Sequence, residues 1–193
     1  MRIAFAALSG AIVIFLWQFV SHMFSPIGEM GFRAPQNENL VLQAAASGLP
    51  ASGAYLLPYL APGKMGDPAA TQAWTEKAQQ NPSLFVVVGP PNTMATNMAP
   101  ALIKQFVTNL LGALLVAVVL AATAWSFGMR VLVALAFGIF GWLLDIVPLW
   151  TWYQFPPDYI IGNLLDQGIG WLLAGIAMAW LLGRRRAALV PAV

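Results

Sequence analysis

Four long apolar segments constrain this chain more than any other feature. They run over residues 3–24, 101–124, 131–150 and 159–182. A helix of about 20 residues, rising about 1.5 Å per residue, crosses the roughly 30 Å hydrocarbon core of a bilayer. Only 8% of the residues are charged, whereas soluble domains carry about a quarter. The sequence therefore predicts an all-α membrane protein, a bundle of four transmembrane helices.

Residues 25–100 form the only long stretch outside these segments. Residues 37–48 have an asparagine cap in front and a glycine stop behind, and residues 67–80 begin with Asp-Pro, so both predict helices. Residues 53–60 and the β-branched run 83–89 predict strands. We expect a small α+β insertion, strand-helix-strand, with too little surface to build a core of its own.

The chain thus divides into a first membrane helix (1–24), the insertion (25–100) and a region with helices two to four and a basic tail (101–193). Arg2 gives the first helix a charged start like that of a signal peptide, but no small-x-small cleavage motif follows it. We expect this helix to be retained as a membrane anchor.

Basic residues near the helix ends predict the orientation in the membrane. Arg2, Arg130 and Arg184 to Arg186 share one side if the N-terminus is cytoplasmic, with no acidic residue among them. The acidic residues outside the spans then fall on the opposite side, and they are Glu29, Glu38, Asp67, Glu76 and Asp158. We expect both termini in the cytoplasm and the insertion in the periplasm of a bacterial inner membrane.

Amide and ionisable side chains within the predicted spans lie in the half that adjoins the insertion, and the other half is almost purely apolar. Asp145 precedes the last turn between spans by a few residues, and Asp166 follows it. A carboxylate in hydrocarbon costs about 2.5 to 3.5 kcal/mol on insertion scales, so each needs a partner, a cavity or a function. We expect a polar pocket open to the outer side, whose candidate ligand- or ion-binding residues are Asp145, Asp166, Asn163, Asn109, His22, Gln18 and Gln167.

Two other interpretations of these residues stay open. They could hydrogen-bond between helices and fix the bundle, each bond contributing about 0.6 kcal/mol, or they could contact another protein. His22 lies near a helix end, where an interfacial role is commoner than a haem-ligand role, and one histidine excludes a bis-histidine haem within a monomer. Small residues on the last two spans predict close helix packing, and they are Gly138, Gly141, Gly168, Gly170, Ala174 and Gly175.

Signatures of catalysis and of cofactor binding are missing from the sequence. It has no cysteine and one histidine, and it contains no glycine-rich phosphate loop, nucleophile elbow or paired-histidine motif. We therefore expect a non-enzymatic protein without cofactor, metal or catalytic residues. The basic residues sit at membrane boundaries rather than in a stripe with aromatics, so we expect no nucleic-acid partner.

Several short motifs are distributed over nearly the whole chain, and they are Trp17, Ser21-His22-Met23, Pro26-x-Gly28-Glu29, Gly53-x-Tyr55, Pro58, Ala73-Trp74, Gly89-Pro90 and Trp150-x-Trp152-Tyr153-x-Phe155-Pro156. With them the chain resembles a group of bacterial inner-membrane proteins of no assigned activity. The resemblance implies four helices with one extracytoplasmic insertion, and it implies no catalytic residue.

The function we expect is that of an accessory or scaffold component, held in the lipid bilayer and associated with another membrane protein or with itself. The insertion motivates this expectation, because it has little core and offers aromatic side chains to a partner. The alternative is a small transport protein that binds a cation or ligand in the outer pocket. A transport route should continue polar residues into the cytoplasmic half, which this sequence lacks unless several copies assemble.

Overall fold

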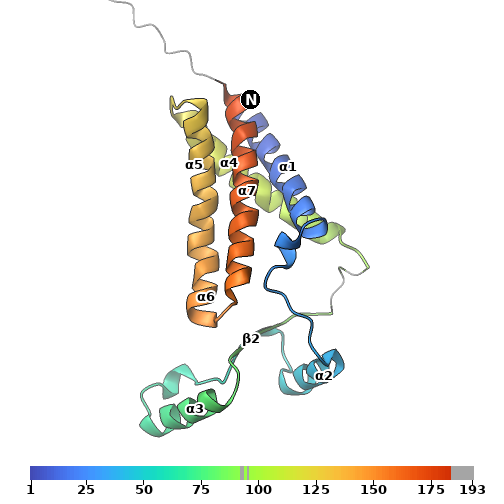
Figure 1. Ribbon diagram of the computed structural model, residues 1–193, viewed down its shortest axis with the longest axis vertical. Coiled ribbons are helices and arrows are strands. Elements are labelled where there is room, and N and C mark those ends of the chain that lie inside the picture. The colour runs from blue at the N-terminus through green and yellow to red at the C-terminus, as the bar shows by residue number, and fades with distance from the viewer. Residues whose placement is uncertain (92–93, 95, 184–193) are drawn as a thin grey trace, which may run out of the picture. The chain divides into compact units, whose positions relative to one another are not determined.

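The computed structural model describes residues 1–91, 94 and 96–183, and most of them are helical (Figure 1). The predicted basic tail at Arg184 to Arg186 lies outside the described residues. The described chain forms two compact units. The membrane unit comprises Met1–Phe32, Thr96–Thr151 and the chain from Phe155 on, and the insertion unit comprises Arg33–Ala95 with Trp152–Gln154.

Four helices among the described residues are long and apolar enough to cross a membrane, which confirms the predicted number. They are α1 (Arg2–Met23), α4 (Ala99–Ala122), a continuous span over Phe127–Tyr153, and α7 (Pro157–Leu182). The predicted bounds differ from these by up to four residues, because caps and flanking turns decide where a helix ends.

The third span is interrupted by a π-helical turn. It consists of α5 (Phe127–Gly141), the turn η4 (Trp142–Ile146) and α6 (Val147–Tyr153). Pro148 lacks a backbone N–H, and in a regular α-helix its ring would collide with the carbonyl of Leu144 four residues earlier. The wider turn directly before the proline accommodates the ring, so the span continues as one helix.

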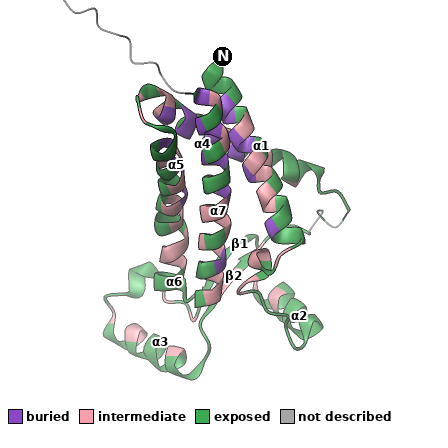
Figure 2. Ribbon diagram, turned by 45° about the horizontal axis from the view of Figure 1, so that its top comes forward, coloured by how far each residue is buried: buried purple, intermediate pink, exposed green. Residues whose placement is uncertain are grey.

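The apolar core of the membrane unit lies in the half nearer the N-terminus of α1. Helix α1 packs against α4 and α7, and α7 packs in turn against α5. Figure 2 shows the buried residues concentrated where these four helices meet. The core consists of small and aliphatic side chains, and they are Ala6, Ala7, Ala11, Ile14, Ala113, Val116, Ala117, Leu120, Ala134, Ala174, Met178 and Leu182.

Glycines allow α7 to approach its neighbours closely. A Cβ atom on Gly138 would lie 2.5 Å from Cδ1 of Trp171, and one on Gly175 would lie 2.7 Å from Cβ of Ala134. The predicted packing role is therefore confirmed at these two positions. It is wrong at Gly168, where an added Cβ would meet no atom within 4 Å.

The insertion unit contains two helices and a two-stranded sheet. Its elements are α2 (Glu38–Gly48), β1 (Gly53–Leu57), the short 3-10 turn η2 (Pro62–Lys64), α3 (Pro68–Gln80) and β2 (Leu84–Val88). The strands pair antiparallel, from Gly53 opposite Val88 to Leu57 opposite Leu84. The predicted strand-helix-strand order is confirmed, and the antiparallel pairing shows that α3 is not a parallel β-α-β crossover.

Side-chain caps explain where the two helices of the insertion unit begin. The Oδ1 atom of Asn37 accepts a hydrogen bond from the Leu40 amide at 3.0 Å, and Oδ1 of Asp67 accepts from the Ala69 amide at 3.0 Å. Such caps satisfy amides that have no partner within the helix. The helix starts predicted from these residues are therefore confirmed.

The insertion unit has almost no interior. None of its described residues is buried. Its tertiary contacts include a hydrogen bond from the Trp74 indole to the Pro58 carbonyl at 3.1 Å and a contact between the rings of Phe85 and Tyr153, which lie 4.9 Å apart. Its short elements are thus held by local caps and one strand pair rather than by a hydrophobic core.

Candidate functional site

A small polar pocket lies at the end of the membrane unit opposite its apolar core. It has a volume of about 110 Å³ and is lined by His22, Ile27, Gly28, Met30, Phe32, Tyr159, Gly162, Asn163 and Asp166. These residues come from the end of α1, the first turns of α7, and the segment that follows α1, which we call the η1 segment (residues 25–32, containing the 3-10 helix Pro26–Glu29).

Glycines let the η1 segment lie directly on the two helices. A Cβ on Gly28 would lie 2.7 Å from Cα of His22, and one on Gly162 would lie 2.7 Å from Cβ of Met30. Gly31 has a φ of +88°, which glycine adopts without strain. The segment therefore covers one side of the pocket.

Asp166 is the acidic side chain of the pocket, and α1 holds it in place. Its Oδ1 atom accepts a hydrogen bond of 2.5 Å from the hydroxyl of Ser21, which is fully buried. Its main-chain carbonyl accepts a hydrogen bond of 2.9 Å from the indole of Trp17. No ion pair joins Asp166 to a basic side chain among the described residues.

The same contacts fix the tautomer of His22. Its Nδ1 atom lies 3.0 Å from the Ser21 hydroxyl and 3.0 Å from the carbonyl of Gln18. The Ser21 hydroxyl has oxygens of both Asp166 and Gln18 within hydrogen-bonding distance. Because the carbonyl of Gln18 can only accept, a hydrogen bond between it and Nδ1 requires a proton on Nδ1. In the neutral imidazole, Nε2 is then an acceptor.

Asn163 presents an acceptor for the same reason. Its Nδ2 atom donates to the main-chain carbonyl of Tyr159 at 2.9 Å. The amide nitrogen must face that carbonyl, so the Oδ1 atom is left to accept from another group. The side chains that line the pocket therefore include a carboxylate, an amide with a free oxygen, an imidazole and the Tyr159 hydroxyl, which can both donate and accept.

Two other predicted residues form a separate cluster between α1 and α4. The Oε1 atom of Gln18 accepts hydrogen bonds from Nδ2 of Asn109 at 2.7 Å and from Nε2 of Gln105 at 3.3 Å. Gln105 also donates to Oδ1 of Asn109 at 3.0 Å. These amides satisfy one another, which is what the bundle-fixing interpretation expects.

Of the seven candidate residues, the structure brings His22, Asn163 and Asp166 together in the pocket. Asp145 is exposed on η4, and neither it nor Gln167 lines the pocket. The Oε1 atom of Gln167 instead lies where a Cβ on Gly141 would meet it, at 3.5 Å.

Sequence reasoning missed Ser21 and the aromatic residues Phe32 and Tyr159. Ser21 follows Trp17 by four residues on the same helix face, and that spacing is the one signal that could have pointed to a shared contact with Asp166.

No family model, curated protein or solved structure matches this chain. The resemblance to the group of bacterial inner-membrane proteins therefore rests on its motifs alone. The function has to be inferred from the chemistry of the two units.

No set of metal-binding side chains lies together in the described part of the chain. The described residues contain no group of three or more histidine, cysteine, aspartate or glutamate side chains that could hold a metal ion. The pocket offers one carboxylate and one imidazole, fewer protein donors than structural zinc sites or calcium sites use.

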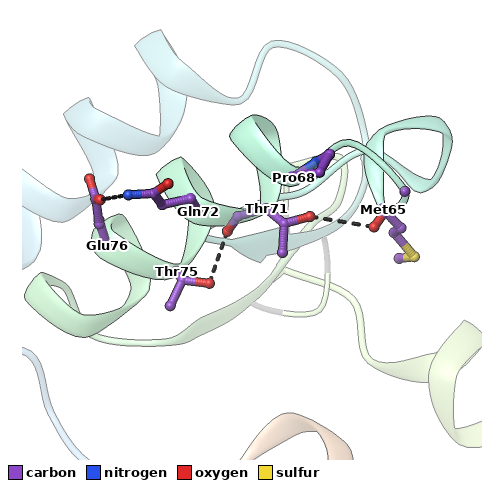
Figure 3. A pocket seen from close by; sticks show the side chains of 7 residues that line it. Met65, Pro68, Thr71, Gln72, Thr75 and Glu76 are labelled. Atoms are coloured by element: carbon purple, nitrogen blue, oxygen red, sulfur yellow. Dashed lines mark hydrogen bonds between the residues drawn. The ribbon is translucent and has the colours of Figure 1, made fainter.

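A larger hollow of about 530 Å³ lies along α3 in the insertion unit (Figure 3). Polar residues that line it form hydrogen bonds with one another: Gln72 donates to Glu76 at 3.0 Å, and Thr75 donates to the Thr71 carbonyl at 2.9 Å. The Thr71 hydroxyl donates to the Met65 carbonyl at 3.4 Å. All of the lining comes from one helix and the turn before it. Polar groups therefore do not surround one point from several sides, as they do in a typical ligand site.

Proposed function

We propose that this chain is a non-enzymatic accessory or scaffold component of a membrane protein assembly. The observation that carries the proposal is the insertion unit, in which no described residue is buried. A segment of this length that folds independently in water buries a core of apolar side chains. A partner that covers the unit would supply the missing burial.

Helix α2 exposes apolar side chains that a partner could cover. Its residues Leu40, Val41 and Leu42 are 62%, 56% and 60% exposed. The helix has 11 residues and no buried side chain. Helices this short are marginal in water without tertiary packing, and adjacent exposed apolar side chains are typical of interaction surfaces.

We further propose a bacterial inner membrane as the location, with both termini cytoplasmic and the insertion unit periplasmic. The distribution of basic residues supports this orientation, because Arg2 lies at the start of α1 and Arg130 near the start of α5, and alternating spans bring these two helix starts to the same side of a membrane. Basic residues close to helix ends favour the cytoplasmic side.

Native mass spectrometry of the full chain in a gentle detergent tests the accessory function. We expect a second membrane protein in a fixed ratio with this chain. The double variant Leu40→Ser and Leu42→Ser should lose it, because both changes remove apolar contact area from α2. The control Val87→Thr changes a residue of β2 that is 68% exposed and should keep the partner. A monomer in every preparation would contradict the proposal.

A second candidate function is the binding of a small cation or ligand, as in a small transport protein. The pocket favours it, because its carboxylate, Asp166, has no ion pair among the described residues. The hydrophobic core in the opposite half of the membrane unit consists of alanine, leucine, isoleucine, valine and methionine side chains, and the buried polar residue described there is Arg130, which is bonded to helix ends. Binding within one copy is therefore better supported than transport through it.

A further inference from the structure

We infer that the pocket of the membrane unit binds the primary ammonium group of a small organic amine. This inference rests on the second candidate function and names the class of ligand. It is independent of the accessory function, which depends on the insertion unit.

Charge is the first reason for a cationic ligand. Asp166 lines the pocket, and neither lysine nor arginine does. A carboxylate inside a membrane span is costly when it has no countercharge, and one hydrogen bond from Ser21 does not neutralise it. A bound cation would supply the missing charge.

The hydrogen-bonding groups of the pocket narrow the class of cation that it could bind. The carboxylate of Asp166 and Oδ1 of Asn163 both accept, while the Ser21 hydroxyl and the Asn163 amide nitrogen already donate to protein atoms. A primary ammonium has three N–H donors and no acceptor, which matches this set. A quaternary ammonium lacks those donors, and an anion would be repelled by the carboxylate of Asp166.

The remaining walls fit a carbon-bearing cation better than a bare metal ion. Ile27 and Met30 line the pocket together with Phe32 and Tyr159, whose rings meet edge to face at 5.7 Å. Hard cations prefer oxygen ligands on several sides, whereas organic ammonium ions bind well beside aromatic faces. The apolar wall would contact the carbon stem of the amine.

The volume of about 110 Å³ suits an amine with few heavy atoms. Two sources offer this chemistry at a membrane boundary, namely a free small amine and the ethanolamine headgroup of a phospholipid. Both present the same ammonium group, so an experiment has to separate them.

Binding of ethanolamine to the full chain in a maltoside detergent tests the inference. We expect saturable calorimetric binding of ethanolamine hydrochloride at constant ionic strength and a rise in the thermal midpoint. Ethylene glycol, in which a hydroxyl replaces the ammonium, should give neither. If only nanodiscs with ethanolamine phospholipid raise the midpoint, compared with choline phospholipid, the ammonium comes from lipid.

Substitutions inside and outside the pocket test whether the ammonium group binds at Asp166. Asp166→Asn keeps an acceptor for Ser21 and removes the charge, so it should weaken binding about tenfold or more. Asn163→Leu should weaken binding as well. Asp145→Asn removes an exposed carboxylate outside the pocket and should leave the affinity unchanged.

Three results would overturn the inference. Ethylene glycol could bind as tightly as ethanolamine, or Asp145→Asn could weaken binding as much as Asp166→Asn. Alternatively, sodium or potassium chloride could stabilise the protein through Asp166 while ethanolamine does not; ligand binding would then stand and the ammonium class would be wrong. Absence of binding by every probe would contradict the second candidate function itself.

Discussion

Asn109 shows how a single amide can connect two membrane helices. It is 7% exposed, and its Nδ2 atom donates to Gln18 on α1 at 2.7 Å. In a membrane the helices have no hydrophobic driving force toward one another, so packing and such hydrogen bonds hold them. The amide cluster therefore positions α4 against the helix that carries Ser21 and His22.

Replacing Asn109 by leucine should lower the free energy of unfolding by about 0.6 kcal/mol, and by no more than about 1.7 kcal/mol. The reason is that Gln18 loses its shorter hydrogen bond while the side-chain volume is nearly kept. Equilibrium unfolding in mixed micelles measures the change. Thr108→Val is the matched control, since the Thr108 hydroxyl bonds only to the Lys104 carbonyl of its own helix; equal effects of the two changes would contradict the role of the cluster.

At the residue scale, the sequence indicated only part of the pocket lining. Asp166, Asn163 and His22 were expected in one half of the membrane and in one pocket, and the structure brings them together. Ser21 was not expected there, because a serine near a helix end has many possible roles. Its partner Asp166 is 145 positions away along the chain, and the periodicity of one helix gives no information about contacts over that separation.

Arg130 is the polar residue that matters most at the scale of whole helices. It is 2% exposed, near the start of α5. Its guanidinium donates to the carbonyl of Gly183 at the end of α7 and to that of Thr123 after α4, the latter at 3.4 Å. A cation at the C-terminal end of a helix also interacts favourably with the helix dipole. One side chain thus joins the ends of three helices.

Replacing Arg130 by methionine should lower the free energy of unfolding by about 1.5 to 3 kcal/mol, because hydrogen bonds from a charged donor are lost. Mixed-micelle unfolding again gives the measurement. Arg2→Met removes an exposed arginine from the N-terminal end of α1 and should change the stability little. A neutral effect of Arg130→Met would show that the desolvation of the buried guanidinium cancels its bonds.

Element boundaries were predictable where local chemistry decides them. Asp67 before Pro68 and Asn37 before α2 cap helices that begin as predicted. The π-helical turn before Pro148 was not predicted, since a proline within an apolar run is compatible with a kink, a break or a wider turn. The antiparallel pairing of β1 and β2 was also not predicted, because the sequence of the connecting segment does not show in which direction the second strand runs.

At the scale of the molecule, the two units differ in what stabilises them. The membrane unit has a core of small side chains and a polar end, whereas no described residue of the insertion unit is buried. Composition predicted both features, because apolar spans and a short proline- and glycine-rich segment have different capacities to bury surface. In the orientation that we propose, the accessory function and the ligand pocket both act on the periplasmic side of the membrane.

Labelling of single cysteines with a membrane-impermeant maleimide tests that orientation most directly, because the chain has no cysteine of its own. Thr75→Cys lies on the exposed surface of α3, and Ala124→Cys lies in the exposed turn between α4 and α5. In intact spheroplasts we predict labelling of Thr75→Cys and none of Ala124→Cys until the membrane is permeabilised. Labelling of Ala124→Cys alone, or of both variants in intact spheroplasts, would contradict the proposed topology.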